Sequence, residues 1–432
     1  MYILTAIIMA VTTQAKDLPE FMIFTYNVDL TEKNLKILSE ADFNIVYGPA
    51  DKLDLCKKYG LKLMIPRPGI ETAKRLRGDP GVWGYDIRDE PLTLKATYET
   101  ADSVKAYRAA DPTHMTFVNL FGKAGHWVKL SIDIVQPDFL SYDHYLWWFG
   151  GINRWFTGED GYYVKLEQFR EEAILAGLPL TVWNEVNVKY QEGPNWITPP
   201  DNDKKIRLLT YASLAYGVKG ILWFYGPPLF DKTGEFNETG RQVAAINHEL
   251  KQLGPVLLPL TSTGVFHTPP FTRGSRQTTP DYWVQPLGKD LVMGTFRDKE
   301  KKEYVMVVNK DWKSSQKATL QFQLWQQVVN SVEMLDKHTG EWKTLPQTMV
   351  KDTRNHEKIY NFDNISPEIK DYISFLPHGK GLTPEMLSFW EKTFTYPPPY
   401  QVVSFTLAPG DGELIRVTFK DGEDFSVPPP KL

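Results

Sequence analysis

Two glutamates stand where strand-like segments end. Glu90 closes the segment 82–90 (VWGYDIRDE), and Glu185 lies near the end of the segment 178–186 (LPLTVWNEV). Pro91 follows Glu90 directly, and because proline has no backbone N–H to donate, it should end that strand and hold Glu90 at its edge. Two carboxyl groups that face one pocket can divide acid–base and nucleophilic work: one gives a proton while the other attacks carbon or activates water.

Eight strand-like segments alternate with helical stretches such as 31–41 (TEKNLKILSEA) and 162–176 (YYVKLEQFREEAILA). Strands that alternate with helices predict a parallel sheet. Eight such units within residues 20–255 favour an α/β fold of the (β/α)8 TIM barrel type over an open sheet. The predicted strands are residues 21–28, 43–48, 61–67, 82–90, 115–121, 138–145, 178–186 and 219–226.

A glycine recurs where a helical stretch gives way to a strand. The junctions read KKYG-LKLMI, ILAG-LPLTV and LAYG-VKGIL, with Gly60, Gly177 and Gly217 at the boundary. Glycine adopts positive φ without a Cβ clash, so it ends a helix cleanly. By similar reasoning, the Gly-Pro pair at 254–255 predicts the end of the helix that completes the eighth unit.

The pattern changes after the eighth unit. Segments of alternating apolar and polar residues follow, for example 402–419 (VVSFTLAPGDGELIRVTF). They predict a C-terminal all-β, sandwich-like domain over residues 256–432, with a short helical insertion near 365–400. The sequences 336–340 (DKHTG) and 409–412 (PGDG) are expected to form hairpin turns.

The barrel prediction brings the two glutamates together. Barrel enzymes place their chemistry at the C-terminal ends of the strands, so Glu90 on strand four and Glu185 on strand seven should share one rim. Two carboxylates there are typical of glycosidic bond cleavage, in which burial and a nearby anion raise the pKa of the acid. A carboxyl separation of roughly 5–5.5 Å is typical of retention, and roughly 6.5–9.5 Å of inversion.

Several motifs resemble the clan A superfamily of retaining (β/α)8 glycosidases, notably the β-galactosidase-like glycoside hydrolase family 42. Residues 84–91 (GYDIRDEP) resemble its strand-four acid/base motif, residues 183–185 (WNE) its strand-seven nucleophile, and residues 220–225 (GILWFY) its eighth strand. Residues 249–257 are similar to its exit from the barrel, and residues 407–412 to a late strand of its accessory β-domain. The resemblance implies a retaining O-glycoside hydrolase with Glu90 as acid/base, Glu185 as nucleophile and a β-linked substrate such as a galactoside.

The resemblance also suggests residues that bind substrate. Family 42 enzymes carry Asn directly before the acid/base, where it contacts the sugar 2-hydroxyl, whereas this chain has Asp89. A carboxylate can still accept a hydrogen bond, and structural pairing with Arg88 or another neighbour is the alternative role for Asp89. The resemblance implies that Tyr145 bonds to the nucleophile and that Trp223 forms part of the sugar subsite; core packing is the alternative for Trp223.

Four further residues join the predicted set from their positions. Asn184 lies beside the nucleophile, His144 lies near the end of strand six, and Arg67 ends strand three, where it could supply positive charge. Trp147 belongs to the aromatic sequence LWWFGG after strand six, which predicts a sugar-stacking surface or a contact with another domain or subunit. For His144, a structural role inside the barrel is the alternative.

Composition excludes several classes of function. The net charge of −4 and pI near 6.1 do not favour nucleic acid as a partner. The 8 His lack metal-site spacing, so we predict no metal and no cofactor. Gly-x-Ser-x-Gly is absent, so a serine hydrolase has no support. The expected partner is an oligo- or polysaccharide, and the oligomeric state stays open.

The N-terminus resembles an export signal. Residues 3–11 (ILTAIIMAV) form an apolar run, and small and polar residues follow up to Ala15. We therefore expect a signal peptide over residues 1–15 and a secreted or periplasmic protein. The run is too short to span a bilayer in the mature protein. Two other functions remain open: a non-catalytic carbohydrate-binding barrel, and a transglycosylase that uses the same carboxylates.

Overall fold

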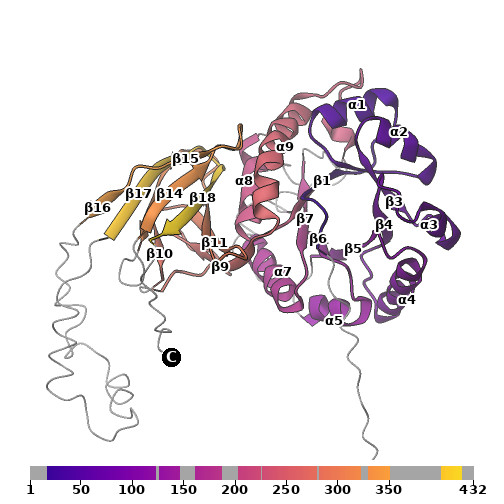
Figure 1. Cartoon of the computed structure of the whole chain (residues 1–432), viewed down its shortest axis with the longest axis horizontal. Helices are drawn as coiled ribbons and strands as arrows, with labels where there is room; N and C mark the ends of the chain where they lie inside the picture. Colours follow the sequence, from indigo (N-terminus) through magenta and orange to yellow (C-terminus); the bar gives the residue numbers. More distant parts are fainter. Residues whose placement is uncertain are drawn as a thin grey trace, which may run out of the picture.

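A computed structural model describes residues 17–122, 126–145, 161–186, 203–224, 226–279, 282–322, 329–350 and 400–420. Eight parallel strands close into a barrel in chain order, which confirms the predicted TIM barrel (Figure 1). The segments expected to form the signal peptide (1–15) and most of the helical insertion (365–400) lie outside the described residues. The barrel strands are β1 (Met22–Thr25), β2 (Ile45–Tyr47), β3 (Lys62–Pro66), β4 (Val82–Asp89), β5 (Met115–Phe121), β6 (Leu140–Asp143), β7 (Leu180–Glu185) and β8 (Gly220–Phe224).

Helices lie on the outer face of the barrel (Figure 1). Thr31, Thr93 and Asn237 begin three of them, each accepting a hydrogen bond from a backbone N–H of the first turn. Gly60, Gly177 and Gly217 have φ of 70°, 66° and 84°, as the helix-to-strand junctions predict. The helices are α1 (Glu32–Glu40), α2 (Leu53–Lys58), α3 (Ile70–Leu76), α4 (Leu94–Ala110), α5 (His126–Val135), α7 (Tyr162–Ala176), α8 (Asp203–Ala215) and α9 (Glu238–Leu257).

Helix α9 continues through Gly254 and Pro255, so the predicted end at this pair is wrong. Gly254 allows close packing: a Cβ there would lie 2.7 Å from the Cβ of Phe21, just before β1. Pro255 removes one backbone donor, but the N–H of Leu258 still bonds to the carbonyl of Gly254 at 2.8 Å. The helix therefore crosses the proline and ends at Leu257.

The strands bury both of their faces. Outward-facing residues such as Tyr85 and Tyr142 pack in one core with the surrounding helices. Inward-facing side chains fill the barrel interior, so no open channel passes between them. Trp183 lies among them, with its ring 5.4 Å from that of Phe24. The interior includes Met22, Phe24, Ile45, Met64, Trp83, Met115, Phe117, Phe139, Trp183 and Leu222.

The C-terminal region forms two antiparallel sheets, as predicted for an all-β domain. One sheet has the strand order β10-β13-β17-β16 and the other β15-β14-β18-β12-β11-β9. Apolar residues from both sheets share one core, which includes Val284, Val305, Leu320, Val403 and Ile415. The strands are β9 (Thr261–His267), β10 (Val284–Leu287), β11 (Leu291–Arg297), β12 (Glu303–Asn309), β13 (Gln316–Phe322), β14 (Val329–Leu335), β15 (Trp342–Thr344), β16 (Thr348–Val350), β17 (Tyr400–Leu407) and β18 (Gly412–Phe419).

The two predicted hairpin turns have different outcomes. Residues 336–340 join the antiparallel neighbours β14 and β15, which confirms the first hairpin. The second prediction is wrong, because β17 pairs with β13 and β16 whereas β18 pairs with β12 and β14. The turn at 409–412 therefore carries the chain from one sheet to the other. Alternation of apolar and polar residues predicts strands, but it does not say which strands pair.

The β-domain packs against helix α8 of the barrel (Figure 1). Helix α8 contacts β11, β12 and β18. Gly294 of β11 permits this approach, because a Cβ at that position would overlap the carbonyl oxygen of Ala215 in α8. The backbones of the two parts therefore meet directly.

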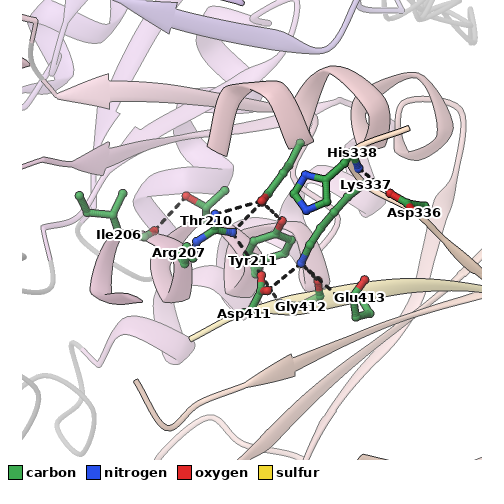
Figure 2. Close-up of polar contacts among 11 residues, drawn as sticks. Ile206, Arg207, Thr210, Tyr211, Asp336, Lys337, His338, Asp411, Gly412 and Glu413 are labelled. Atoms are coloured by element: carbon green, nitrogen blue, oxygen red, sulfur yellow. Dashed lines mark hydrogen bonds and ion pairs between the residues drawn. The ribbon is translucent and has the colours of Figure 1, made fainter. Parts of the chain in front are cut away.

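Charged side chains join the two parts beside this contact (Figure 2). Arg207 of α8 donates two hydrogen bonds to Glu249 of α9, at 2.7 and 3.0 Å, and lies 3.4 Å from Asp411. Lys337, in the turn between β14 and β15, lies 2.8 Å from Asp411 and 3.2 Å from Glu413. Both Lys337 and Glu249 are buried. The network thus fixes the β-domain against two helices of the barrel.

Replacing Lys337 with Met tests the importance of this network. The substitution removes the buried cation but keeps most of the apolar stem, so it leaves the partly buried carboxyls of Asp411 and Glu413 without their shared partner. We expect the free energy of unfolding to fall by about 3 kcal/mol, measured by urea denaturation.

Lys343→Met is the matched control. Lys343 pairs with Asp336 at an exposed position of the same domain, where solvent screens the interaction. Its loss should change the urea midpoint little. Equal destabilisation by the two substitutions would show that the buried network does not hold the β-domain in place.

Candidate active site

A β-bulge in β4 sets the direction of the predicted site residues. The register against β5 shifts between Asp86 and Arg88, so Ile87 is an extra residue in the strand. Ile87 packs in the helix-facing core, and Arg88 also turns outward, where it lies 3.2 Å from Glu99 of α4. Bulges commonly redirect side chains beside active sites. Here the bulge excludes Arg88 as the partner of Asp89 and turns Asp89 toward the barrel opening.

Asn119 of β5 connects Asp89 with a carboxyl group on β6. Its Nδ2 donates to Asp89 Oδ1 at 3.0 Å and to Asp143 Oδ1 at 3.2 Å. The side chain of Asn119 is buried, whereas that of Asp89 is exposed. One amide group therefore brings carboxyls from β4 and β6 to the same place on the rim.

Glu90 lies next to these groups in a strained backbone conformation. Its φ is +43°, which is unusual for a residue with a side chain, and its N–H donates to the carbonyl of Asn119 at 2.9 Å. The side chain of Glu90 is half-buried. Burial and then the charge of Asp89 raise the pKa of Glu90, against the opposing effect of the Asp143 hydrogen bond.

Asp143 is a third carboxyl of this cluster, and the sequence-based site does not include it. Burial, followed by the charges of Glu90 and Asp89, raises the pKa of Asp143 to about 8. The hydrogen bond from Asn119 opposes this increase. At neutral pH the structure thus favours a protonated carboxyl at the end of β6.

Tyr145 and Glu185 continue the site toward β7. Burial, followed by the charges of Asp143, Tyr26 and Glu185, raises the pKa of the Tyr145 hydroxyl. Glu185 itself is only 3% exposed. His144 lies beside Gly122, where a Cβ would come within 3.0 Å of the histidine Nδ1. The charges of both Asp143 and Glu185 therefore act on Tyr145.

Arg67 lies on the other side of the cluster. It is exposed, and its N–H donates to the carbonyl of Asp86 at 3.0 Å. Tyr47 of β2 donates its hydroxyl hydrogen to Asp86 Oδ2 at 2.8 Å. Burial raises the pKa of Asp86, while this hydrogen bond and the charge of Arg67 oppose the increase. The charge of Arg67 thus acts on Asp86.

Aromatic rings line the interior end of the site. Tyr26 lies 5.2 Å from Trp183 and 5.8 Å from Phe224, measured between ring centroids. Tyr145 lies 4.6 Å from Phe224. Tyr26, Tyr47 and Phe224 are each partly exposed. Flat, partly exposed rings beside carboxyl groups are suited to hold a sugar, because its C–H faces pack on rings and its hydroxyls need polar partners.

Two predicted substrate contacts are wrong. Trp223 is fully buried in the core outside the barrel, and its Nε1 donates to Asn247 of α9 at 2.8 Å. Asn184 is 2% exposed, and its Nδ2 lies 3.4 Å from Thr210 Oγ1 of α8. Adjacent strand residues face opposite sides, so the inward direction of Trp183 already turns Asn184 outward. The predicted contact Trp147 lies outside the described residues.

Sequence reasoning missed Asp143, Asn119, Tyr26, Tyr47 and Phe224. A signal was present for most of them, because each lies at or near the end of a predicted barrel strand. Asp143 precedes His144 and Tyr145, which the prediction selected instead. Alternation from an inward residue of each strand would have identified Asp143 and Phe224.

Within the described ranges, no group of three or more His, Cys, Asp or Glu side chains has an arrangement suited to a metal ion. In the same ranges, no helix is both long and apolar enough to cross a membrane.

No family model matches the chain, and no curated protein matches it in sequence. Similar solved structures include alpha-L-fucosidase isoenzyme 2 from Paenibacillus thiaminolyticus, with 7% identity, 93% of this chain and 100% of that chain covered, and a TM-score of 0.49. A family 27 β-L-arabinopyranosidase from Geobacillus stearothermophilus has 9% identity, coverage of 94% and 97%, and a TM-score of 0.45. A family 51 alpha-L-arabinofuranosidase from Bifidobacterium longum has 10% identity, coverage of 94% and 98%, and a TM-score of 0.42. At such low identity these similarities concern the fold alone.

The raised pKa of Asp143 predicts a pH-dependent stability. Between about pH 4 and pH 8 the unfolded chain releases the Asp143 proton while the folded protein keeps it, so stability falls as pH rises through this window. An asparagine side chain cannot ionise, so the substitution Asp143→Asn should remove this contribution. We expect the melting temperature of the variant to rise relative to wild type as pH increases from 5 to 9.

Asp133→Asn provides the comparison, because Asp133 forms an exposed ion pair with Lys129. Its melting temperature should follow that of wild type at every pH. If the difference in melting temperature between wild type and Asp143→Asn stays constant across pH, Asp143 is not protonated in the folded protein at neutral pH.

Proposed function

We propose that the protein is a retaining glycoside hydrolase that cleaves β-linked oligo- or polysaccharides through a glycosyl-enzyme intermediate. Glu90 acts as acid/base and Glu185 as nucleophile. The proposal rests on one observation. Glu90, whose pKa is raised, and Glu185 both lie at the C-terminal ends of strands in one barrel. The motif resemblance assigns the same two residues to these roles.

The two glutamates occupy different environments, which suits different roles. Glu90 is half-buried beside other carboxyls, so its proton is retained toward neutral pH and is available for the leaving oxygen. Glu185 is the last residue of β7 and is 3% exposed. Separation into an acid side and a nucleophile side is what double displacement requires.

Asp143 is not a suitable nucleophile partner for Glu90. Burial and the charges of Glu90 and Asp89 raise the pKa of Asp143 to about 8, whereas a nucleophile must be ionised at neutral pH. We therefore assign the nucleophile to β7 and keep Asp143 with the acid.

The aromatic rings and Asp89 are the groups proposed to bind the substrate. Tyr26 and Phe224 offer partly exposed faces for a sugar ring, and Asp89 keeps an exposed carboxylate that can accept a hydrogen bond from a sugar hydroxyl. The family resemblance places β-galactosides first among the sugars to test. Transglycosylation would use the same carboxyls and would differ only in the acceptor that replaces water.

A panel of aryl β-glycosides and polysaccharides tests the assignment. With the best substrate, Glu185→Gln should lower kcat by about 10⁴-fold or more, because no nucleophile remains. Glu90→Gln should lower kcat about 10²–10⁴-fold for poor leaving groups, and azide should partly restore turnover of activated substrates by replacing water in the second step. Proton NMR of the first product should show the anomer of the substrate.

Glu40→Gln is an isosteric control at an exposed position of α1 and should leave kcat unchanged. Full activity in either active-site variant, or an inverted first product, would contradict the assignment. Binding of oligosaccharide without any turnover would favour a non-catalytic carbohydrate-binding barrel instead.

A further inference from the structure

We propose that a cavity between the barrel and the β-domain binds a small organic anion with an apolar body, of the class of aryl-alkyl carboxylates. The cavity has a volume of about 430 Å³, within the roughly 300–1,000 Å³ of pockets that bind drug-sized molecules. It lies at the N-terminal ends of β7 and β8, at the end of the barrel opposite Glu90 and Glu185. The inference therefore does not depend on the proposed function.

Segments from both parts of the molecule enclose the cavity. The barrel contributes the end of α7, the residues that lead into β7 and β8, and the residues that follow α9. The β-domain contributes the start of β9 and Lys299, in the turn between β11 and β12. A ligand in this position would contact both parts at once and so stabilise their junction.

Lys219 is the residue that most favours an anion. Its ammonium donates hydrogen bonds to the backbone carbonyls of Leu257 and Leu260, where α9 ends. Both acceptors are neutral, and among the described residues Lys219 forms no ion pair with a carboxylate. Burial lowers the pKa of this side chain to about 7, as expected for an ammonium without a counterion. An anion in the cavity would supply the missing negative charge.

The other charged groups that line the cavity add to this preference. Arg170 is buried, and it donates hydrogen bonds to Ser262 Oγ at 2.9 Å and to Glu167 at 3.0 Å. Lys299 is an exposed third cation, whereas Asp17 is the one carboxylate among the described lining residues. Even with Glu167 counted against Arg170, positive charge exceeds negative charge around the cavity.

Much of the remaining wall is apolar. Such a wall does not complement a strongly hydrated ion, because it offers few polar partners. It suits a ligand whose carboxylate meets Lys219 while its apolar body packs on the wall. The apolar lining residues include Leu18, Ala173, Ile174, Leu178, Leu258 and Leu260.

Calorimetry with three probes tests the proposal on the full chain. 4-Phenylbutyrate should bind with a Kd on the order of 1 mM or tighter, as expected for a ligand of its size. Acetate has the charge without the apolar body, and 4-phenylbutanamide has the body without the charge, so each should bind about tenfold more weakly. Equal binding of the amide, or no binding of 4-phenylbutyrate at about 10 mM, would overturn the proposal.

Lys219→Met removes the cation and keeps most of the apolar stem. It should weaken the binding of 4-phenylbutyrate about tenfold, and unchanged affinity would contradict the proposed site. Lys251→Met is the control, because Lys251 pairs with Asp42 at an exposed position of α9, and it should bind as wild type does. Wild-type affinity should also fall as pH rises through about 7, since Lys219 loses its proton while the ligand carboxylate stays ionised.

Ile174 provides a test that leaves Lys219 and its hydrogen bonds in place. This residue lines the cavity from α7 and is 44% exposed, so the fold should tolerate polar substitutions there. Asp and Asn have nearly the same size, but only Asp adds a negative charge. Ile174→Asp should therefore bind 4-phenylbutyrate about fivefold more weakly than Ile174→Asn. Equal affinities of these two variants would rule out a site in this cavity.

Discussion

The crowding of carboxyl groups from β4 and β6 around Asn119 of β5 is the constraint on which the site depends. Asp89, Glu90 and Asp143 would repel one another if all were ionised, and they would separate on a flexible chain. The barrel prevents this separation because β4, β5 and β6 are hydrogen-bonded neighbours whose ends meet at one rim. The side-chain amide of Asn119 on β5 donates hydrogen bonds to Asp89 of β4 and to Asp143 of β6. Protonation relieves the remaining repulsion, and a proton held in this way is what an acid catalyst needs.

The β-domain supports the opposite side of the site through helix α8. This helix contacts β7, which carries Glu185. The hydroxyl oxygen of its Thr210 accepts a hydrogen bond from the side chain of Asn184. The same helix holds the buried charge network with Lys337 and Asp411. The region remote from the rim thus fixes the helix that packs behind the proposed nucleophile. A rigid support of this kind is required because small displacements of catalytic groups are costly.

The sequence was sufficient to predict the barrel and to place Glu90 and Glu185 at strand ends, because strand ends can be identified from apolar segments and from glycine or proline boundaries. Glu90 was identifiable for this reason. Asn184 and Trp223 show where family resemblance was less informative than alternation, since both side chains face the helices. The bulge at Ile87 could not be predicted, because it depends on how β4 pairs with β5. Asp143 needed spatial information for a related reason: its raised pKa results from burial and from residues on another strand.

Covalent trapping of the nucleophile tests the central claim most directly. A 2-deoxy-2-fluoro glycoside with a good leaving group slows both steps, and the leaving group favours accumulation of the glycosyl-enzyme. After proteolysis, mass spectrometry should find one sugar adduct, on the peptide that contains Glu185. An adduct on Asp89, Glu90 or Asp143 would contradict the assignment of an acid side on β4 and β6 and a nucleophile on β7.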